Sequence, residues 1–240
     1  MNKKQADKIL TEVKDSYQII ADHFSRTRYR DWSEFAIFKK YIKSGDKALD
    51  AGCGNGRLYD SLQELDIEYQ GVDISSKLID KAKNKYPEAK FEVGDILSLP
   101  FADQQFDVLL SIATLHHVPS SKYRKQVIED FARVIKPGGY LMVTVWNLAQ
   151  REMNKELGNL PPADIINKDG DQIIDVMRPW KNPQGEVLAK RYLHGFSQQE
   201  LEQLISSSGF KIIESFYAKR GKKTGPNQAY NLCLIAQKMI

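Results

Sequence analysis

Apolar residues recur along this chain at two different spacings, which divide it into expected helices and strands. Between residues 3 and 22, apolar side chains return every three or four positions, as on one face of an α-helix. From residue 46 to residue 146, short apolar runs alternate with stretches of helical spacing. Strands are expected at 48–50, 68–72, 89–93, 106–112 and 140–146, and helices at 58–65, 75–84 and 122–134. This alternation predicts an α/β fold with an open, mostly parallel sheet covered by helices on both faces.

The regular alternation is interrupted twice. A short helix over 32–42 precedes the first strand, and residues 147–190 contain Pro161, Pro162 and scattered Asp and Asn. The second segment is longer than an ordinary connection, so we expect a lid or insertion. A helix over 198–207 and strands over 211–217 and 229–237 then predict an antiparallel pair at one sheet edge. We expect one domain in four parts: a cap (1–45), a ligand-binding core (46–146), an insertion (147–190) and a closing unit (191–240).

Composition excludes several classes of protein. The 240 residues are 42% hydrophobic and 28% charged, as in globular proteins. No apolar run reaches the roughly 18 residues of a membrane helix, and no signal-peptide core follows the first residues. We therefore expect a cytoplasmic protein without a membrane partner. Cys53 and Cys233 are far apart and have no cysteine neighbour, which indicates neither a metal site nor a disulfide.

Charge is unevenly distributed along the chain. Residues 1–45 carry 10 Lys and Arg against 6 Asp and Glu, and residues 178–240 carry 10 against 4, within a net charge of +4. A basic rim around an acidic centre would suit a polyanionic substrate. An ordinary solvated surface accounts for the same counts.

The stretch from Asp50 to Gly56 is the most informative part of the sequence. An apolar strand ends in an acid, glycines follow at 52, 54 and 56, and a helix is expected to begin nearby. Glycine lacks a Cβ, so a ligand can lie directly against such a turn, while the helix start offers unpaired N–H groups. The spacing is G-x-G-x-G, whereas dinucleotide sites use G-x-G-x-x-G, which argues against a nicotinamide enzyme.

Polar residues follow the strands that surround this turn. Ligands of open α/β sheets bind beyond the carboxyl ends of the strands, where Asp50, Asp73, Asp95 and Ser111 are expected to converge. Asp73 lies where an acid accepts hydrogen bonds from a ribose, and Asp95 with Ile96 could recognise an adenine. The pattern predicts an adenosine-containing ligand. Its expected contacts are Asp50, Gly52, Cys53, Gly54, Gly56, Asp73, Ile74, Asp95, Ile96 and Ser111.

Five motifs in order resemble the class I S-adenosylmethionine-dependent methyltransferases. They are LDAGCGNG at 49–56, the acid at Asp73, the GDI step at 94–96, LLSIATLHH at 109–117 and KPGG at 136–139. The resemblance covers about residues 40–146. It implies a Rossmann-like seven-stranded sheet, mostly parallel with an antiparallel last strand, and S-adenosylmethionine as cofactor.

A narrower resemblance lies in the flanking segments. HFSRTRYRDW at 23–32, SIATLHH at 111–117, RPW at 178–180 and KRYLHGF at 190–196 are similar to the eukaryotic-type wobble-uridine tRNA methyltransferases. That likeness implies esterification of 5-carboxymethyluridine, tRNA as partner and a small zinc-binding activator subunit. The family's tryptophan-rich ending is replaced here by QAYNLC at 228–233.

Few residues are needed for chemistry on such an acceptor. A carboxylate is ionised at neutral pH and needs no general base, so alignment is the main task. We expect His116 to orient the acceptor, although a histidine bonded to backbone is the alternative, and Arg28 to act beside it. Arginines suit oxyanions, and a basic turn at 219–223 could contact phosphate or only solvent. The expected substrate contacts are His23, Arg26, Arg28, Tyr29, His117, Arg191 and His194.

Two other functions fit the same sequence. One is a methyltransferase for a small acid, phenol or quinone precursor, with its pocket closed by the 147–190 insertion. The other is a noncatalytic module that binds an adenosyl ligand.

Overall fold

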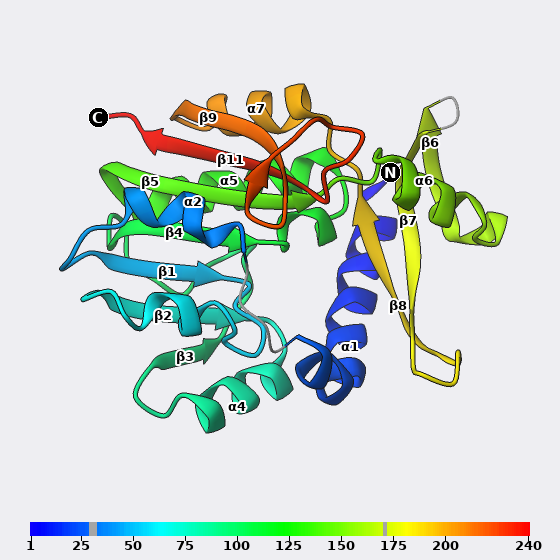
Figure 1. The fold of residues 1–240 in the computed structure, drawn as a ribbon, viewed down its shortest axis with the longest axis horizontal. Coiled ribbons are helices and arrows are strands. Elements are labelled where there is room, and N and C mark those ends of the chain that lie inside the picture. Colours follow the sequence, from blue (N-terminus) through cyan, green and yellow to red (C-terminus); the bar gives the residue numbers. More distant parts are fainter. Residues whose placement is uncertain (29–32, 170–171) are drawn as a thin grey trace.

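The computed structural model describes residues 1–28, 33–169 and 172–240, so the expected contact at Tyr29 lies outside the described residues. Its centre is an eight-stranded sheet in the order β10-β9-β11-β5-β4-β1-β2-β3, beside a three-stranded sheet in the order β6-β7-β8 (Figure 1). The strands of the large sheet are β1 (Lys47–Ala51), β2 (Glu68–Asp73), β3 (Lys90–Val93), β4 (Phe106–Ile112), β5 (Ile135–Trp146), β9 (Phe210–Lys219), β10 (Lys222–Lys223) and β11 (Asn231–Lys238).

The strand directions confirm the predicted α/β architecture. Strands β1 to β5 pair in parallel, while β11 is antiparallel to both of its neighbours, β5 and β9. The prediction of seven strands was one short. The basic turn after β9 folds back as the two-residue strand β10, with Lys222 opposite Lys219.

Helices cover both faces of the large sheet, as predicted (Figure 1). The helices of the described chain are α1 (Lys3–Thr27), α2 (Phe35–Phe38), α3 (Tyr59–Leu62), α4 (Ser76–Lys85), α5 (Ser121–Val134), α6 (Arg151–Gly158) and α7 (Gln198–Ser206), with 3₁₀ turns η1 (Lys39–Tyr41), η2 (Leu115–His117) and η3 (Pro162–Asp164). Helices α1 and α6 lie beside the small sheet and do not cover the large one. Ser75 caps α4 as expected, because its hydroxyl accepts the N–H of Leu78. The helix predicted over 58–65 is a single turn, since Leu65 N–H bonds back to Leu62 and leads into β2.

Strand β4 has apolar cover on both faces. Leu109 packs into one cluster with α5 and α7 residues, while Val108 and Leu110 pack into a second cluster on the opposite face. A central parallel strand is buried in this way because helices lie on both sides.

The segment expected to be an insertion has a fold of its own. It holds α6, η3 and three antiparallel strands, β6 (Ile165–Asp169), β7 (Gln172–Lys181) and β8 (Val187–His194). Strand β8 therefore crosses the boundary expected after residue 190. Helix α1 packs against both β8 and α4, and Ser16 Oγ donates to the carbonyl of Lys190 at 2.6 Å. Figure 1 shows α1 between the two sheets.

No helix in the described part of the chain combines the length and apolar character that crossing a bilayer requires.

Candidate cofactor and acceptor cleft

A cleft opens at the carboxyl ends of β1, β2 and β4, beneath helix α1. Eleven of the residues expected from the sequence line it: Arg28, Asp50, Gly52, Cys53, Gly54, Asp73, Ile74, Asp95, Ile96, His117 and Arg191. The structure thus brings together acids from the core and cations from the cap and the small sheet.

The glycine turn has the backbone that its sequence requires. Gly52, Gly54 and Gly56 have φ angles of +88°, +57° and +76°, which L side chains rarely adopt. A Cβ on Gly52 would lie 2.3 Å from Thr114 Oγ1. Gly56 does not line the cleft. It allows close packing, because its Cβ would lie 2.9 Å from the ring of Phe91.

Asp73 is fixed at the end of β2 by backbone groups. Its carboxylate accepts the N–H of Gly54 at 2.9 Å and the N–H of Ser75 at 2.8 Å. Burial raises the pKa of this carboxyl, while the two N–H groups oppose the rise. The glycine turn and the start of α4 therefore hold an acceptor group at the cleft.

The other expected cofactor residues differ in their environments. Asp50 accepts a hydrogen bond from the hydroxyl of Tyr69 at 3.0 Å, and burial raises its pKa to about 7. Asp95 is oriented by the N–H of Leu97 at 2.9 Å. Ser111 is fully buried and does not line the cleft, whereas the three residues after it, Ile112 to Thr114, do.

This half of the cleft fits an adenosyl ligand. The backbone of Gly52 and Gly54 forms part of its wall, and Asp73 and Asp95 present oriented oxygens to hydroxyl or amine donors. Ile74 and Ile96 supply apolar surface beside them. Donors on a ribose and an adenine would satisfy these acceptors.

In the other half of the cleft, two arginines lie close to the indole of Trp180. The guanidinium of Arg191 lies 4.5 Å from the ring centre of Trp180, and that of Arg28 lies 5.3 Å from it. Arg191 is only 3% exposed, and its Nε is buried without a hydrogen-bond partner. Among the side chains that the structure describes, no carboxylate forms an ion pair with either arginine. Burial, and next the charge of Arg191, lower the pKa of Arg28.

His117 faces the cleft in a defined tautomer. Its Nδ1 lies 2.7 Å from the carbonyl oxygen of Tyr192, and because that oxygen only accepts, Nδ1 carries the proton. Nε2 then accepts the hydroxyl of Tyr17 at 2.7 Å. Burial, and then the charge of Arg191, lower the pKa of His117 to about 3, so the ring is neutral. Arg191 donates to the Tyr17 oxygen at 3.4 Å.

The structure does not bring His116 to the cleft. It is fully buried, and its Nδ1 accepts the N–H of Trp146 at 3.3 Å. The turn η2 directs His117 and not His116 toward the ligand space. The arrangement matches the backbone-bonded alternative for His116.

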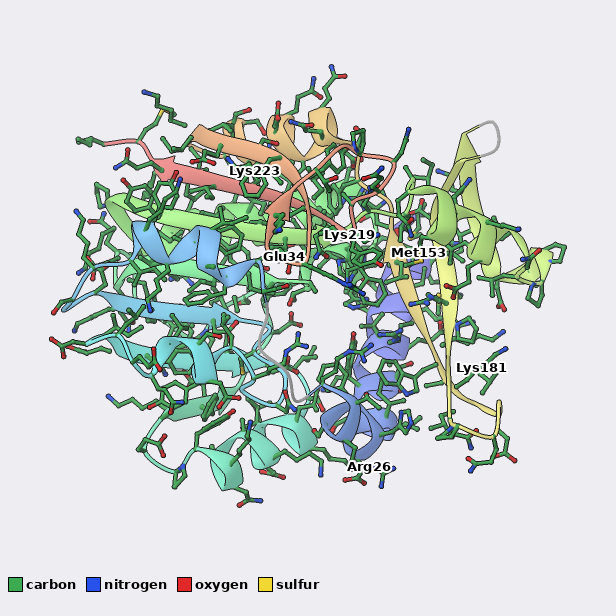
Figure 2. All side chains as sticks on the ribbon, in the orientation of Figure 1. Arg26, Glu34, Met153, Lys181, Lys219 and Lys223 are labelled. Carbon is green, nitrogen blue, oxygen red and sulfur yellow. The ribbon has the colours of Figure 1, made fainter. Side chains whose placement is uncertain are left out.

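Three expected substrate residues also lie away from the lining. His23 accepts the indole N–H of Trp180 at 2.8 Å and so supports that ring from behind. Arg26 is exposed at the end of α1, at the lower edge of Figure 2. His194 is buried between Asp175 and Glu200.

Sequence reasoning missed the aromatic part of the site. Tyr17 and Phe24 from α1 and Trp146 from the end of β5 line the cleft, and Trp180 from β7 packs against Phe24. Tyr17 falls within the stretch 3–22, for which the sequence predicts only an apolar helix face. Its polar tip on that face was the available signal.

The mostly parallel sheet, the glycine turn and the oriented acids together define an S-adenosylmethionine-dependent methyltransferase of class I. Residues 49–143 match the family described as a methyltransferase domain. A solved S-adenosylmethionine-dependent methyltransferase from Methanosarcina mazei superposes with a TM-score of 0.67 at 26% identity, over 85% of this chain and 97% of that one.

Two curated relatives narrow the class. The tRNA (carboxymethyluridine(34)-5-O)-methyltransferase of Schizosaccharomyces pombe is 31% identical over 223 residues, covering 85% of this chain and 91% of the relative. The protein of that name from Arabidopsis thaliana is 41% identical over 136 residues, or 57% of this chain and 33% of the relative, so this chain matches a third of that longer protein. The chain belongs to the family of the tRNA (carboxymethyluridine(34)-5-O)-methyltransferases.

One solved complex shows the same fold with a partner. A Haloferax volcanii methyltransferase, bound to the Trm112 methyltransferase activator, superposes with a TM-score of 0.66 at 18% identity, over 95% of this chain and 98% of that one. At this identity the likeness concerns the fold.

Proposed function

We propose that this protein transfers a methyl group from S-adenosylmethionine to the carboxylate of 5-carboxymethyluridine at position 34 of tRNA. The observation that carries the proposal is the pair of guanidiniums, Arg28 and Arg191, without a carboxylate partner in the described chain and in the same cleft as the cofactor residues. A buried guanidinium, that of Arg191, and a half-buried one, that of Arg28, are costly to hold near one indole unless an anion joins them. The names of the relatives support the same acceptor.

Bound S-adenosylmethionine supplies a methyl group on a sulfonium, which passes to a carboxylate oxygen to leave a thioether and a methyl ester, with no proton transferred. The protein's part is to align the acceptor. Arg191 can hold both carboxylate oxygens in its planar fork. His117 need not act as a base, and its Nε2 already accepts the Tyr17 hydroxyl.

The reaction neutralises a positive and a negative charge. This loss of charge determines whether a residue of the cleft affects acceptor binding or the methyl transfer itself. A cation and an anion become two neutral groups, so the water-poor lining of Tyr17, Phe24 and Trp146 does not oppose the step. The attraction between Arg191 and the carboxylate weakens as the anion disappears. Arg191 therefore stabilises the bound acceptor more than the transition state and acts mainly through KM.

The experiment gives the protein labelled S-adenosylmethionine and tRNA that carries 5-carboxymethyluridine, with and without a Trm112-type activator. Nucleosides are identified after digestion. We expect label in the uridine derivative, released by mild alkali because it is an ester. Alkali-stable label, or label only on free small acids supplied in parallel, would overturn the proposal. We further propose that an activator of the Haloferax kind raises this activity, which the same assay tests.

A further inference from the structure

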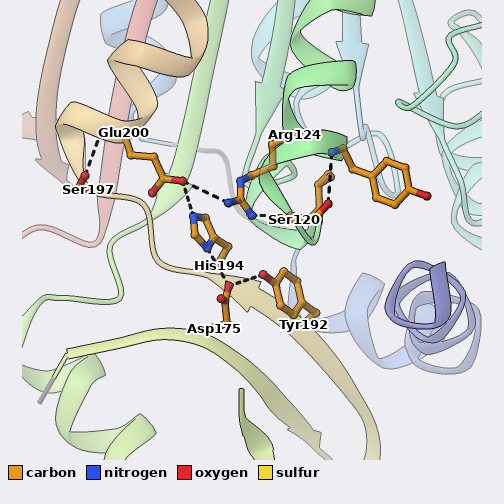
Figure 3. Close-up of polar contacts among 9 residues, drawn as sticks. Ser120, Arg124, Asp175, Tyr192, His194, Ser197 and Glu200 are labelled. Atoms are coloured by element: carbon orange, nitrogen blue, oxygen red, sulfur yellow. Dashed lines mark hydrogen bonds and ion pairs between the residues drawn. The ribbon is translucent and has the colours of Figure 1, made fainter. Parts of the chain in front are cut away.

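Behind the cleft, a group of buried and partly buried polar side chains joins the small sheet to the main body (Figure 3). His194, at the end of β8, lies at its centre with a side chain that is 4% exposed. Its Nδ1 is 2.8 Å from Asp175 on β7, and its Nε2 is 2.9 Å from Glu200 on α7. Ionised carboxylates only accept, so both ring nitrogens carry protons and the ring is cationic.

Arg124 on α5 completes the charge balance of this group. It donates to Glu200 at 3.3 Å and to the carbonyl of Val118 at 3.3 Å, and its side chain is 8% exposed. Two carboxylates thus face two cations. The balance holds only while His194 is protonated, and the two carboxylates hold its pKa above the ordinary value despite burial.

The same group continues to the cleft. Tyr192 donates its hydroxyl to Asp175, and its carbonyl accepts the Nδ1 proton of His117. His117 in turn accepts from Tyr17, whose oxygen accepts from Arg191. Two sets of hydrogen bonds, joined through the covalent structure of Tyr192, therefore connect α7 and β7 on one side with His117, Tyr17 and the guanidinium of Arg191 on the other.

The position of Arg191 explains why this connection matters. It directly precedes Tyr192 on β8, and its burial is complete apart from 3% exposure. Beyond the Tyr17 oxygen it has aromatic faces around it, and no acid among the described side chains pairs with it. The position of strand β8, and not an ion pair, therefore determines where the Arg191 guanidinium lies.

We infer that His194 is a positioning residue, which holds β8 through Asp175 and Glu200 and thereby keeps Arg191 in the acceptor half of the cleft. The inference rests on the proposed function, because the acceptor role of Arg191 comes from it. His194 itself does not touch the ligand space. The sequence expectation of a substrate contact at His194 is thus replaced by an indirect role.

The test compares His194→Gln with Glu200→Gln, and with the control Glu202→Gln on the same helix. We expect His194→Gln to raise KM for the tRNA by about tenfold or more, since small displacements of an orienting group are costly. The Kd for S-adenosylmethionine should stay within about twofold, because no cofactor contact changes. Glu200→Gln should give a smaller rise in the same direction, and Glu202→Gln none.

A second measurement does not depend on tRNA. In ¹⁵N-labelled protein without ligand, both imidazole nitrogens of His194 should be protonated at pH 7, and His194→Gln should shift the Arg191 Nε–H resonance. Leu201→Val, which trims a buried apolar side chain on α7, serves as the stability control.

The outcomes separate the two claims. If wild-type protein methylates no tRNA, the proposed function fails, while the NMR result still decides whether His194 controls Arg191. If wild-type protein is active and His194→Gln changes KM no more than Leu201→Val does, the positioning role is overturned. An unchanged Arg191 signal overturns it as well.

Discussion

Asp73 is oriented before any ligand binds, because two backbone N–H groups hold its carboxylate. We predict that Asp73→Ala weakens S-adenosylmethionine binding by about 10- to 100-fold, the value of one or two hydrogen bonds to a charged group. Calorimetric titration measures this change. Asp80→Ala, on the exposed face of α4, is the matched control and should bind normally. Equal affinities for the two variants would remove Asp73 from the cofactor site.

Arg191 and Arg178 lie opposite each other on β8 and β7 but have different partners. Arg178 bonds to Glu156 at 2.7 Å, whereas Arg191 lines the cleft and pairs with no acid in the part of the chain whose side chains are described. We predict that Arg191→Gln raises KM for the tRNA by about tenfold or more, with a smaller effect on kcat, because the ion contact weakens as the carboxylate loses charge. Steady-state kinetics on tRNA measures both constants. Arg178→Gln should change KM far less, and a fall confined to kcat in Arg191→Gln would contradict this role.

Gly52 combines a positive φ with a close neighbour, and Gly138 has the φ alone. A Cβ at Gly138 would meet no atom within 4 Å, while one at Gly52 would overlap Thr114. We predict that Gly138→Ala lowers the free energy of unfolding by about 1–2 kcal/mol. Gly52→Ala should lower it by about 1–3 kcal/mol more, the typical cost of overpacking. Urea titration of the two variants gives the difference, and equal losses would show that Thr114 moves aside freely.

The sequence predicts the residues of the glycine turn better than those around the acceptor. Parallel strands end at a common edge, so the positions of Asp50, Asp73 and Asp95 follow from strand order alone. The choice between His116 and His117 depends on how one short turn is oriented, which local sequence does not determine. Trp180 reaches the site only through the pairing of β7 with β8, a contact far along the chain.

At the level of elements, the sequence likewise predicts the strands of the core better than those of the insertion. Central strands carry unbroken apolar runs because both faces are covered, so β4 was predicted at its observed bounds. Strand β8 is exposed over its first half and buried over its second, which produces neither a continuous nor an alternating pattern. Its partners are helix α1 and strand β7, and the turns around it do not reveal them.

The group around His194 joins these elements and should make stability depend on pH. The pKa of His194 is raised above 6.5, so its contribution is complete below pH 6.5 and is lost as pH rises through the higher folded value. The pKa values of Asp175 and Glu200 are lowered from 3.8 and 4.5. The contribution of these two carboxylates to stability is therefore lost as pH falls through their lower folded values. The charged or titratable groups that face this ring or lie near it are Asp175, Glu200, Arg124, Tyr192 and His116.

We therefore predict that the group stabilises the fold most between about pH 4.5 and 6.5. Urea unfolding from pH 5 to pH 9 should show a loss of stability above pH 6.5 in the wild-type protein that is smaller in His194→Gln. Parallel curves for the two proteins would mean that His194 titrates alike in the folded and unfolded states.

For the whole molecule, the basic ends of the chain do not form a uniform rim. Lys223 and Lys40 both pair with Glu214. The hydrogen bond from Lys223, and to a smaller extent that from Lys40, lowers the pKa of the Glu214 carboxyl to about 2. In Figure 2, Lys219 and Lys223 lie in the upper part of the molecule, whereas Arg26 lies at its lower edge. At the basic turn, Arg220 and Lys222 are exposed and have no ion pair in the described chain.

Arg220 and Lys222 are thus two exposed cations of this turn that are available for phosphate, while Lys219 is half-buried and lies over the ring of Tyr230. We predict that Arg220→Gln with Lys222→Gln weakens tRNA binding and lowers the slope of log Kd against log salt by about 1–2, because each phosphate contact releases a counterion. Filter binding at several salt concentrations measures the slope. Cofactor affinity should not change. Lys83→Gln with Lys90→Gln, at the opposite edge of the sheet, removes the same charge and should leave the slope intact. If both double variants lower it equally, binding responds to net charge alone, and the basic turn has no particular place in the tRNA interface.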